Sequence, residues 1–264
     1  VVGYKTHAKM LMIVRREPEG LRRYVHLGTG NYHAKTARLY TDYSLFTADP
    51  EIGEDVHRIF MQLTSLGRAT TLGKLLQAPF SLLPTLLTLI EREADNARQG
   101  RPARIVAKMN ALIERKVIEA LYAASAAGVQ IDLIVRGVCA LRPGLPGVSE
   151  NIRVRSIVGR FLEHTRVFYF ENGGQPRLFG ASADWMDRNL YRRVETCFPI
   201  EEPTLKQRVV DELMIYLRDN MQAWELGADG TYTRVQHEQA PALSAQAWLL
   251  ERLAENPLPG GGDD

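Results

Sequence analysis

Two stretches far apart in the chain each place a histidine two residues before a cation. In "THAKMLMIVR" His7 precedes Lys9, and in "EHTRVFYFEN" His164 precedes Arg166. Residues two apart on a strand share a face, so each pair would present an imidazole beside a positive charge. One neutral imidazole can attack a phosphorus centre while a second holds or protonates the departing oxygen. The flanking cations would bind the oxygens whose charge grows during transfer. The pattern therefore favours phosphoryl transfer through a histidine.

The surroundings of the two histidines repeat as well. In each copy a second strand returns and ends in small residues followed by a short polar one, "GTGN" at 28–31 and "ASAD" at 181–184. Small residues let backbone N–H groups approach a phosphate closely. We expect Asn31 and Asp184 to orient neighbouring groups rather than to react. A lone histidine would be interpreted as an ordinary strand residue, but two copies with matching partners predict a two-histidine site.

The composition is that of an ordinary globular protein. Apolar residues make up 45% and charged residues 24%, and 33 basic against 31 acidic side chains give no global bias toward nucleic acid or membrane. Residues 1–40 nevertheless hold eight Lys/Arg against two Glu, and residues 136–166 hold six Arg against two Glu. These zones suggest a focused anion site, with solvated strand faces as the alternative. The longest apolar run, 75–90, contains two prolines and is too short to span a bilayer. Cys139 and Cys197 lack metal-like spacing and suit a reducing, cytoplasmic setting.

The elements that must position these residues alternate between strands and helices. A hairpin is predicted at 4–15 and 21–28, joined by the turn "REPEG". The order strand 104–110, helix 114–128, strand 129–137 implies a parallel sheet with a right-handed crossover. Further helices are predicted at 52–66, from near Pro84 to the "NARQGRPA" break, at 203–224 and at 243–254, followed by a disordered tail "PLPGGGDD". The fold class is α/β.

This doubled layout resembles the phospholipase D superfamily, whose halves each supply a His-x-Lys strand and a Gly-Ser-x-Asn return. Val14 stands where the first motif has its acidic residue, Glu171 fills that position in the second, and Arg166 replaces lysine. The stretches 28–47, 131–164 and 182–195 are similar to the C-terminal catalytic region of bacterial polyphosphate kinases.

The resemblance extends to about residue 235 and implies two phospholipase D-like halves with mixed and parallel sheets flanked by helices. The first half, 1–72, would be truncated at its N-terminus, the second would span 73–258, and 259–264 would be a tail.

The resemblance also implies a role for each matching residue. His7 matches the phosphohistidine that takes the γ-phosphoryl group of ATP. His164 matches the second active-site histidine, which acts in acid–base chemistry or holds phosphate, and which also contacts ATP. Lys9 and Arg166 match the catalytic cations of the family. Tyr40 and Arg136 match nucleotide-contacting residues, and Arg136 ends a predicted parallel strand, where α/β sheets bind ligands. His26 and His33 lack repeat partners, so we expect structural roles for them. A phosphate or polyphosphate channel is expected to be lined by Asn31, Arg142, Asp184, Arg188, Arg192 and Arg193.

These matches imply a polyphosphate kinase that binds ATP or ADP, with Mg²⁺ accompanying ATP, and inorganic polyphosphate. No protein-held metal and no nucleic acid are expected in this stretch. The full-length protein is expected to be a cytoplasmic homo-oligomer, with peripheral attachment to the inner face of the membrane left open. The family carries further domains before this region, so the activity of this chain alone also stays open. Two alternatives remain: a phosphodiesterase of the wider superfamily, and a non-catalytic polyphosphate-binding module.

Overall fold

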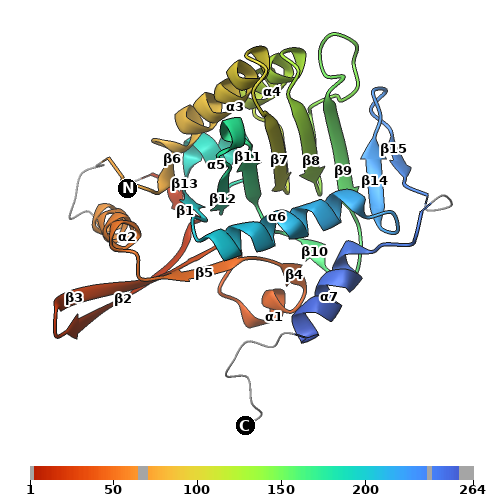
Figure 1. The fold of residues 1–264 in the computed structure, drawn as a ribbon. Helices are drawn as coiled ribbons and strands as arrows, with labels where there is room; N and C mark the ends of the chain where they lie inside the picture. The colour runs from red at the N-terminus through yellow and green to blue at the C-terminus, as the bar shows by residue number, and fades with distance from the viewer. Residues whose placement is uncertain (1–2, 65–70, 237–239, 256–264) are drawn as a thin grey trace.

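One large mixed sheet forms the centre of the structure (Figure 1). A computed structural model describes residues 3–64, 71–236 and 240–255, and within them this sheet has ten strands. Its order is β1 (Lys5–Thr6), β13 (Arg193–Pro199), β12 (Arg177–Ala181), β11 (Val167–Phe170), β7 (Arg104–Met109), β8 (Gln130–Val135), β9 (Ile152–Ile157), β14 (Ala223–Leu226) and β15 (Tyr232–Arg234), with β6 (Leu76–Ala78) paired to β13.

Helices cover both faces of this sheet. In Figure 1, α3 (Leu82–Arg98) and α4 (Arg115–Ala126) lie over one face, and α6 (Pro203–Arg218) crosses the other. The helices α5 (Asp187–Arg192), α7 (Ala245–Glu255) and the 3-10 turn η1 (Asn172–Gly174) complete the second half of the chain. The α4 helix links β7 to β8, which pair in parallel with Val106 opposite Asp132. The predicted parallel crossover is therefore confirmed.

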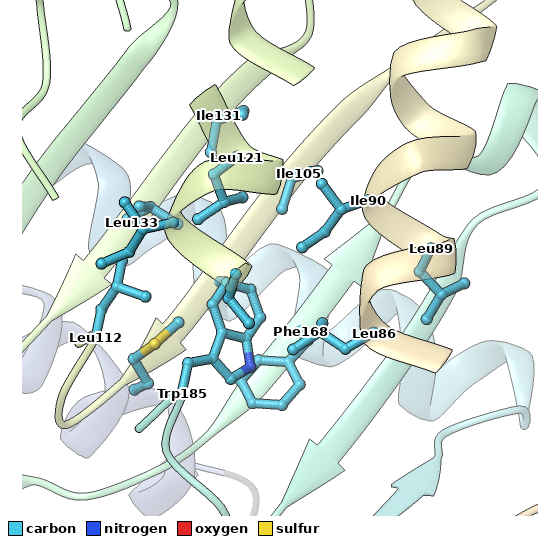
Figure 2. Close-up of a cluster of buried hydrophobic side chains, with 14 of the residues drawn as sticks. Leu86, Leu89, Ile90, Ile105, Leu112, Leu121, Ile131, Leu133, Phe168 and Trp185 are labelled. Carbon is cyan, nitrogen blue, oxygen red and sulfur yellow. The ribbon is translucent and has the colours of Figure 1, made fainter. Parts of the chain in front are cut away.

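The core follows from the alternation of side chains along these strands. In β7, Ile105 and Ala107 belong to the apolar cluster under α3 and α4, whereas Val106 between them belongs to the cluster under α6. All three are completely buried. Figure 2 shows the first cluster, in which Trp185 packs against Phe168 beneath both helices. Because both faces are covered, these strands are almost continuously apolar.

A second sheet carries the opening hairpin. Its strands are β2 (Lys9–Glu17), β3 (Gly20–Gly28) and β5 (Ser44–Thr47), and the β2–β3 turn closes with Glu17 opposite Gly20. Met10 and Met12 pack toward the core together with α2 (Pro50–Leu63), while Leu11 and Ile13, which alternate with them along β2, are 46% and 57% exposed. The Asp49 carboxylate caps α2 by accepting the N–H groups of residues 51 and 52.

Two short parallel strand pairs join the two halves of the chain. The first is β1 with β13, in which Thr6 lies opposite Val194. The second is β4 (Tyr40–Thr41) with β10 (Leu162–Glu163), in which Thr41 lies opposite Glu163. The four-residue helix α1 (Ala34–Ala37) lies just before β4. In each pair a histidine directly follows one of the opposed residues: His7 follows Thr6, and His164 follows Glu163. The two strand pairs therefore position both histidines.

Most predicted elements are confirmed over the described residues, with two differences, and the last two positions of the predicted helix 52–66 lie outside those residues. The predicted helix 203–224 ends at Arg218, because the Asp219 carboxylate accepts the N–H groups of Met221, Gln222 and Ala223 and turns the chain into β14. His7 and His164 do not lie within strands but just before β2 and β11.

The division of the chain at residue 72 stays a prediction. The strand β1 joins the large sheet, and one apolar cluster combines Val25 and Ile59 with Val106 and Phe198. The predicted tail 259–264 lies outside the described residues.

Candidate active site

His7 sits where the chain passes from the large sheet to the hairpin. The N–H groups of His7 and Ala8 both donate to the carbonyl oxygen of Val194, at 2.9 and 3.0 Å. The next residue on that strand, Glu195, places its carboxylate 2.9 Å from His7 Nδ1. With Nδ1 donating to this carboxylate, the lone pair of the neutral ring is on Nε2. The side chain of His7 is 21% exposed, so part of the ring is accessible to solvent.

Glu195 is completely buried, and its charge is held by several donors. The hydroxyl of Ser182 donates to one carboxylate oxygen at 2.5 Å, and the amide of Asn189 donates to the other at 2.6 Å. A buried carboxylate needs such partners to remain charged. Glu195 is therefore a fixed anion behind His7, suited to orient the ring and to stabilise positive charge on it.

His164 has the same kind of partner from the opposite half of the chain. Its Nδ1 lies 2.8 Å from one carboxylate oxygen of Asp42, and Arg166 donates to its Nε2 at 3.1 Å. Burial lowers the pKa of His164, and the positive charge of Arg166 acts in the same direction, against the raising influence of Asp42. His164 is therefore neutral near pH 7 and carries its proton on Nδ1.

The two histidine–carboxylate pairs cross between the halves in a matched way. His7 from the first half is served by Glu195 from the second, and His164 from the second is served by Asp42 from the first. In each case the residues directly before the histidine and before its carboxylate lie opposite each other in a short parallel strand pair. The two histidines are therefore positioned in the same way.

The small residues after β3 accommodate Asp42. Thr29 donates its hydroxyl to Asp42 at 2.7 Å, and a Cβ on Gly30 would collide with the Asp42 carboxylate. The "GTGN" stretch therefore has a structural reason besides the predicted approach of backbone to phosphate.

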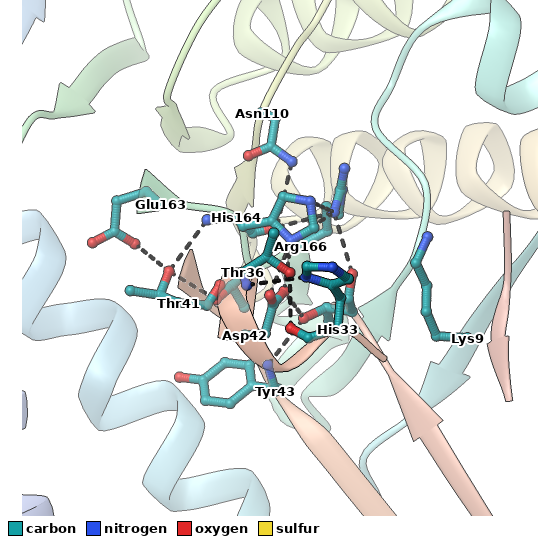
Figure 3. A network of polar contacts seen from close by, with 12 residues as sticks. Lys9, His33, Thr36, Thr41, Asp42, Tyr43, Asn110, Glu163, His164 and Arg166 are labelled. Atoms are coloured by element: carbon teal, nitrogen blue, oxygen red, sulfur yellow. Dashed lines mark hydrogen bonds and ion pairs between the residues drawn. The ribbon is translucent and has the colours of Figure 1, made fainter. Parts of the chain in front are cut away.

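Figure 3 shows Arg166 within the network of polar contacts around His164, and Lys9 apart from its dashed lines. Lys9 is 5% exposed, and its ammonium donates to the carbonyl oxygen of His7. Burial lowers the pKa of Lys9 to about 8, with Glu195 and Asp42 opposing this shift and Arg166 adding to it. Arg166 donates to the carbonyl oxygen of Thr29 at 3.3 Å, and the preceding residue, Gly28, lies opposite Lys9 in the hairpin, so the two halves of the site adjoin. Arg166 is bound through Nε and Nη2 to Asp184, at 3.2 and 3.0 Å, so its binding of phosphate oxygens stays a prediction.

The predicted nucleotide contacts lie beside His164. The Tyr40 ring is centred 5.0 Å from the His164 ring. Burial lowers the pKa of Arg136, and the charges on Asp184 and Arg166 act on it as well. The Nη1 atom of Arg136 is buried without a hydrogen-bond partner among the described residues. An unsatisfied guanidinium nitrogen at this place suits an anionic ligand.

The remaining predicted channel residues divide into two groups. Asp184 accepts from Arg166 and from the N–H of Asn110, and Arg193 influences the pKa of Lys9, so both belong to the site. Arg142, in contrast, donates to the carbonyl oxygen of Ala228 in the loop between β14 and β15. Asn31, Arg188 and Arg192 are exposed, and no contact joins their side chains to either histidine in the part of the chain that the structure describes. Channel lining by these four residues stays a prediction.

The two unrepeated histidines make local contacts. His26 Nδ1 lies 2.6 Å from the Tyr32 hydroxyl, and its ring lies 4.6 Å from that of Phe46. His33 caps α1, because its Nδ1 accepts the N–H of Thr36 at 3.3 Å. These contacts agree with structural roles.

Sequence reasoning missed Asp42 and Glu195. Both lie in stretches that carry the family resemblance, Asp42 in "ARLYTDY" and Glu195 at the end of "SADWMDRNLYRRVE". An acidic residue close to a repeated motif was the available signal. Over residues 3–64, 71–236 and 240–255, no group of three or more His, Cys, Asp or Glu side chains is arranged to hold a metal ion. No helix in these ranges is long and apolar enough to cross a bilayer.

Fold and site together define an α/β protein with a duplicated histidine–carboxylate centre. A family model described as "Polyphosphate kinase C-terminal domain 2" matches residues 75–246, and "Polyphosphate kinase C-terminal domain 1" matches residues 1–69. The chain belongs to the polyphosphate kinase family.

Individual relatives agree. The chain is 64% identical over 256 residues to a polyphosphate kinase of Xylella fastidiosa strain Temecula1, covering 96% of this chain and 36% of that protein. It is 61% identical over 256 residues to one of Pseudomonas aeruginosa, covering 96% and 37%. The crystal structure of polyphosphate kinase from Porphyromonas gingivalis aligns with a TM-score of 0.92 at 40% identity, over 97% of this chain and 40% of that one. The chain thus spans little more than a third of the length of the curated relatives it matches.

Proposed function

We propose that this chain carries the active site of an ATP:polyphosphate phosphotransferase, which moves the terminal phosphate of ATP reversibly to inorganic polyphosphate through His7. The observation that carries the proposal is the crossed arrangement of two histidine–carboxylate pairs, with the charges of both carboxylates acting on Lys9. Two imidazoles of fixed tautomer and several cations match the requirements of phosphoryl transfer through a covalent intermediate.

In the first step, His7 Nε2 attacks the γ-phosphorus of MgATP. The N–P bond forms as the bond from the γ-phosphorus to the β–γ bridging oxygen breaks, and ADP departs with that electron pair. Glu195 stabilises the positive charge that develops on the His7 ring. Lys9 and Arg136 are suited to bind phosphate oxygens.

In the second step, a terminal oxygen of polyphosphate attacks the same phosphorus and the N–P bond breaks. This restores His7 and lengthens the polyphosphate by one phosphate unit. The departing oxygen is the one that leaves with ADP in the first step, and holding or protonating it is the proposed role of His164. Asp42 orients the ring through Nδ1, and a proton taken up on Nε2 would give the imidazolium that donates to this oxygen. One phosphoanhydride is broken and one is formed, so the reaction is reversible. Mg²⁺ enters only as the counter-ion of ATP, and a homo-oligomer stays a prediction.

Labelled ATP tests the proposal. The full-length protein that contains this chain, and the 264-residue chain alone, are incubated with MgATP labelled at the γ-phosphate. We expect an acid-labile, base-stable label on the peptide that contains His7, and its transfer to acid-insoluble polymer. Label that is lost only to water or an alcohol would instead support a phosphodiesterase. Polyphosphate binding without label on either protein would support the non-catalytic module.

The low pKa of Lys9 predicts a decline of activity at alkaline pH. Below about pH 8 the ammonium is charged and can bind phosphate oxygens, and above it the charge is lost. The value of kcat/KM depends on the protonation state of the free enzyme. For ATP it should therefore fall above that pKa, with a limiting slope of about tenfold per pH unit. The arginine in Lys9→Arg stays charged at alkaline pH. The decline of kcat/KM in that variant should therefore begin at a pH at least about one unit higher. The full-length enzyme is assayed from pH 6 to 10, with the melting temperature measured at each pH. An unchanged profile in a folded Lys9→Arg enzyme would exclude Lys9 as the titrating group.

A further inference from the structure

The C-terminal helix α7 is tied to the chain segment that leads into His164. Gln246 lies in its first turn and is 4% exposed. The N–H of Phe161 donates to its Oε1 at 3.0 Å, and its Nε2 donates to the carbonyl oxygen of Phe161 at 2.9 Å. One side-chain amide therefore satisfies both backbone groups of a residue three positions before His164.

The same amide also holds Glu163. Nε2 of Gln246 donates to Oε1 of Glu163 at 2.7 Å. The other carboxylate oxygen, Oε2, accepts from the Thr41 hydroxyl at 2.8 Å and pairs with Lys108 Nζ at 2.8 Å. Burial alone would raise the pKa of Glu163, but Lys108 and the hydrogen bonds from Gln246 and Thr41 bring it below its usual value. Glu163 is thus a buried anion with an oriented partner on each side.

Glu163 and Thr41 set the geometry of the His164–Asp42 pair. They face each other in the β10–β4 register, and each directly precedes one member of the pair. The Thr41 hydroxyl also accepts the N–H of His164 at 3.2 Å. Any shift of Glu163 against Thr41 would therefore change the distance from His164 Nδ1 to the Asp42 carboxylate.

We propose that Gln246 is a positioning residue for phosphoryl transfer, acting on His164 through Glu163 and Thr41. The proposal rests on the proposed function of His164, and it gives α7 a part in the reaction without contact with substrate. Loss of the Gln246 amide removes one hydrogen bond from a buried oxygen of Glu163 and one from each backbone group of Phe161. These groups must then shift to find others, which alters the orientation of the imidazole.

The test compares two glutamines in the full-length protein. Gln246→Leu removes the amide that reaches Glu163. Gln222→Leu is the matched control. Among the described residues the Gln222 side chain makes one hydrogen bond, accepting from the Ser244 hydroxyl, so its loss loosens the same region without removing a partner of Glu163. For each variant, kcat and KM for ATP, the melting temperature and the rate of modification of His164 by diethyl pyrocarbonate are measured. The exposed His33 is the internal reference in the peptide mass spectra.

We expect Gln246→Leu to lower kcat by about 10- to 100-fold, the scale of a misplacement near 1 Å. Modification of His164 relative to His33 should become several-fold faster, since the imidazole is released from Asp42. Gln222→Leu should change neither value, and Gln246→Glu should not restore them, because a second carboxylate would face Glu163. Equal changes in both leucine variants, or no change in Gln246→Leu, would overturn the proposal. A wild-type protein without transferase activity would contradict the proposed function, while the modification rates would still test the positioning of His164.

Discussion

His7→Asn should abolish both the acid-labile label and polyphosphate synthesis. Without the imidazole there is no nitrogen to form the N–P bond, and loss of a covalent nucleophile lowers kcat by at least about 10⁴-fold. Asparagine is smaller than histidine and polar, and the backbone bonds from His7 and Ala8 to Val194 do not involve the lost side chain. The fold should therefore persist, which circular dichroism and the melting temperature check.

The control for this variant is His33→Asn. His33 caps α1 through its side chain, and asparagine is itself a favoured N-cap residue, so structure and activity should both be retained. His164→Gln separates the roles of the two histidines. Label should still reach His7 in that variant, but transfer should be slower. Label that persists in His7→Asn and disappears in His164→Gln would assign the phosphohistidine to the second half of the chain.

The predictable part of the fold consisted of the helices and strands that a local hydrophobic pattern or local turn residues specify. The apolar runs of β7 and β8 on either side of α4 identified a parallel pair, and the polar turn after Glu17 identified the hairpin. The C-terminal boundary of α6 was not predictable in the same way. The apolar residues Met221, Ala223 and Trp224 continue beyond the helix, and only the turn held by Asp219, which also accepts the N–H of Ala245, ends it.

The histidines of the candidate site could be predicted because the motif repeats, whereas their carboxylates could not be predicted from spacing. Glu195 lies 188 residues from His7 along the chain, and Asp42 lies 122 residues from His164. These pairs form only when the short strands β1 and β4 dock on β13 and β10. No local rule gives that register, because strands of two residues carry too little pattern. Residues on exposed surfaces, such as Arg188, are equally ambiguous, since solvation and ligand binding both favour arginine there.

Glu195→Gln should lower the rate of polyphosphate synthesis by on the order of 10³- to 10⁴-fold, comparable to the loss on neutralising the carboxylate of a serine-protease triad. The amide keeps the volume of the carboxylate but removes the charge that stabilises the positive His7 ring. If the amide nitrogen faces His7 Nδ1, the ring must also adopt the other tautomer, which protonates the attacking Nε2. If the amide nitrogen faces Asn189 instead, the loss of charge acts alone. In either orientation the formation of the N–P bond is slowed, so the label should appear more slowly while KM for ATP changes by less than about threefold.

The structure gives a reason for this variant to fold. Asn189 now donates to Glu195, and its Oδ1 has no hydrogen-bond partner among the described residues. Rotation of the Asn189 amide would let Oδ1 accept from the new glutamine, so the melting temperature should fall by no more than about 4 °C. Glu93→Gln is a control of equal burial, since Glu93 is also 0% exposed but accepts the backbone N–H groups of Arg104 and Asn172. It should cost stability and leave labelling of His7 unchanged. If Glu195→Gln lost stability but kept the wild-type rate of labelling, Glu195 would be a structural carboxylate and the paired-histidine mechanism would lose its anion.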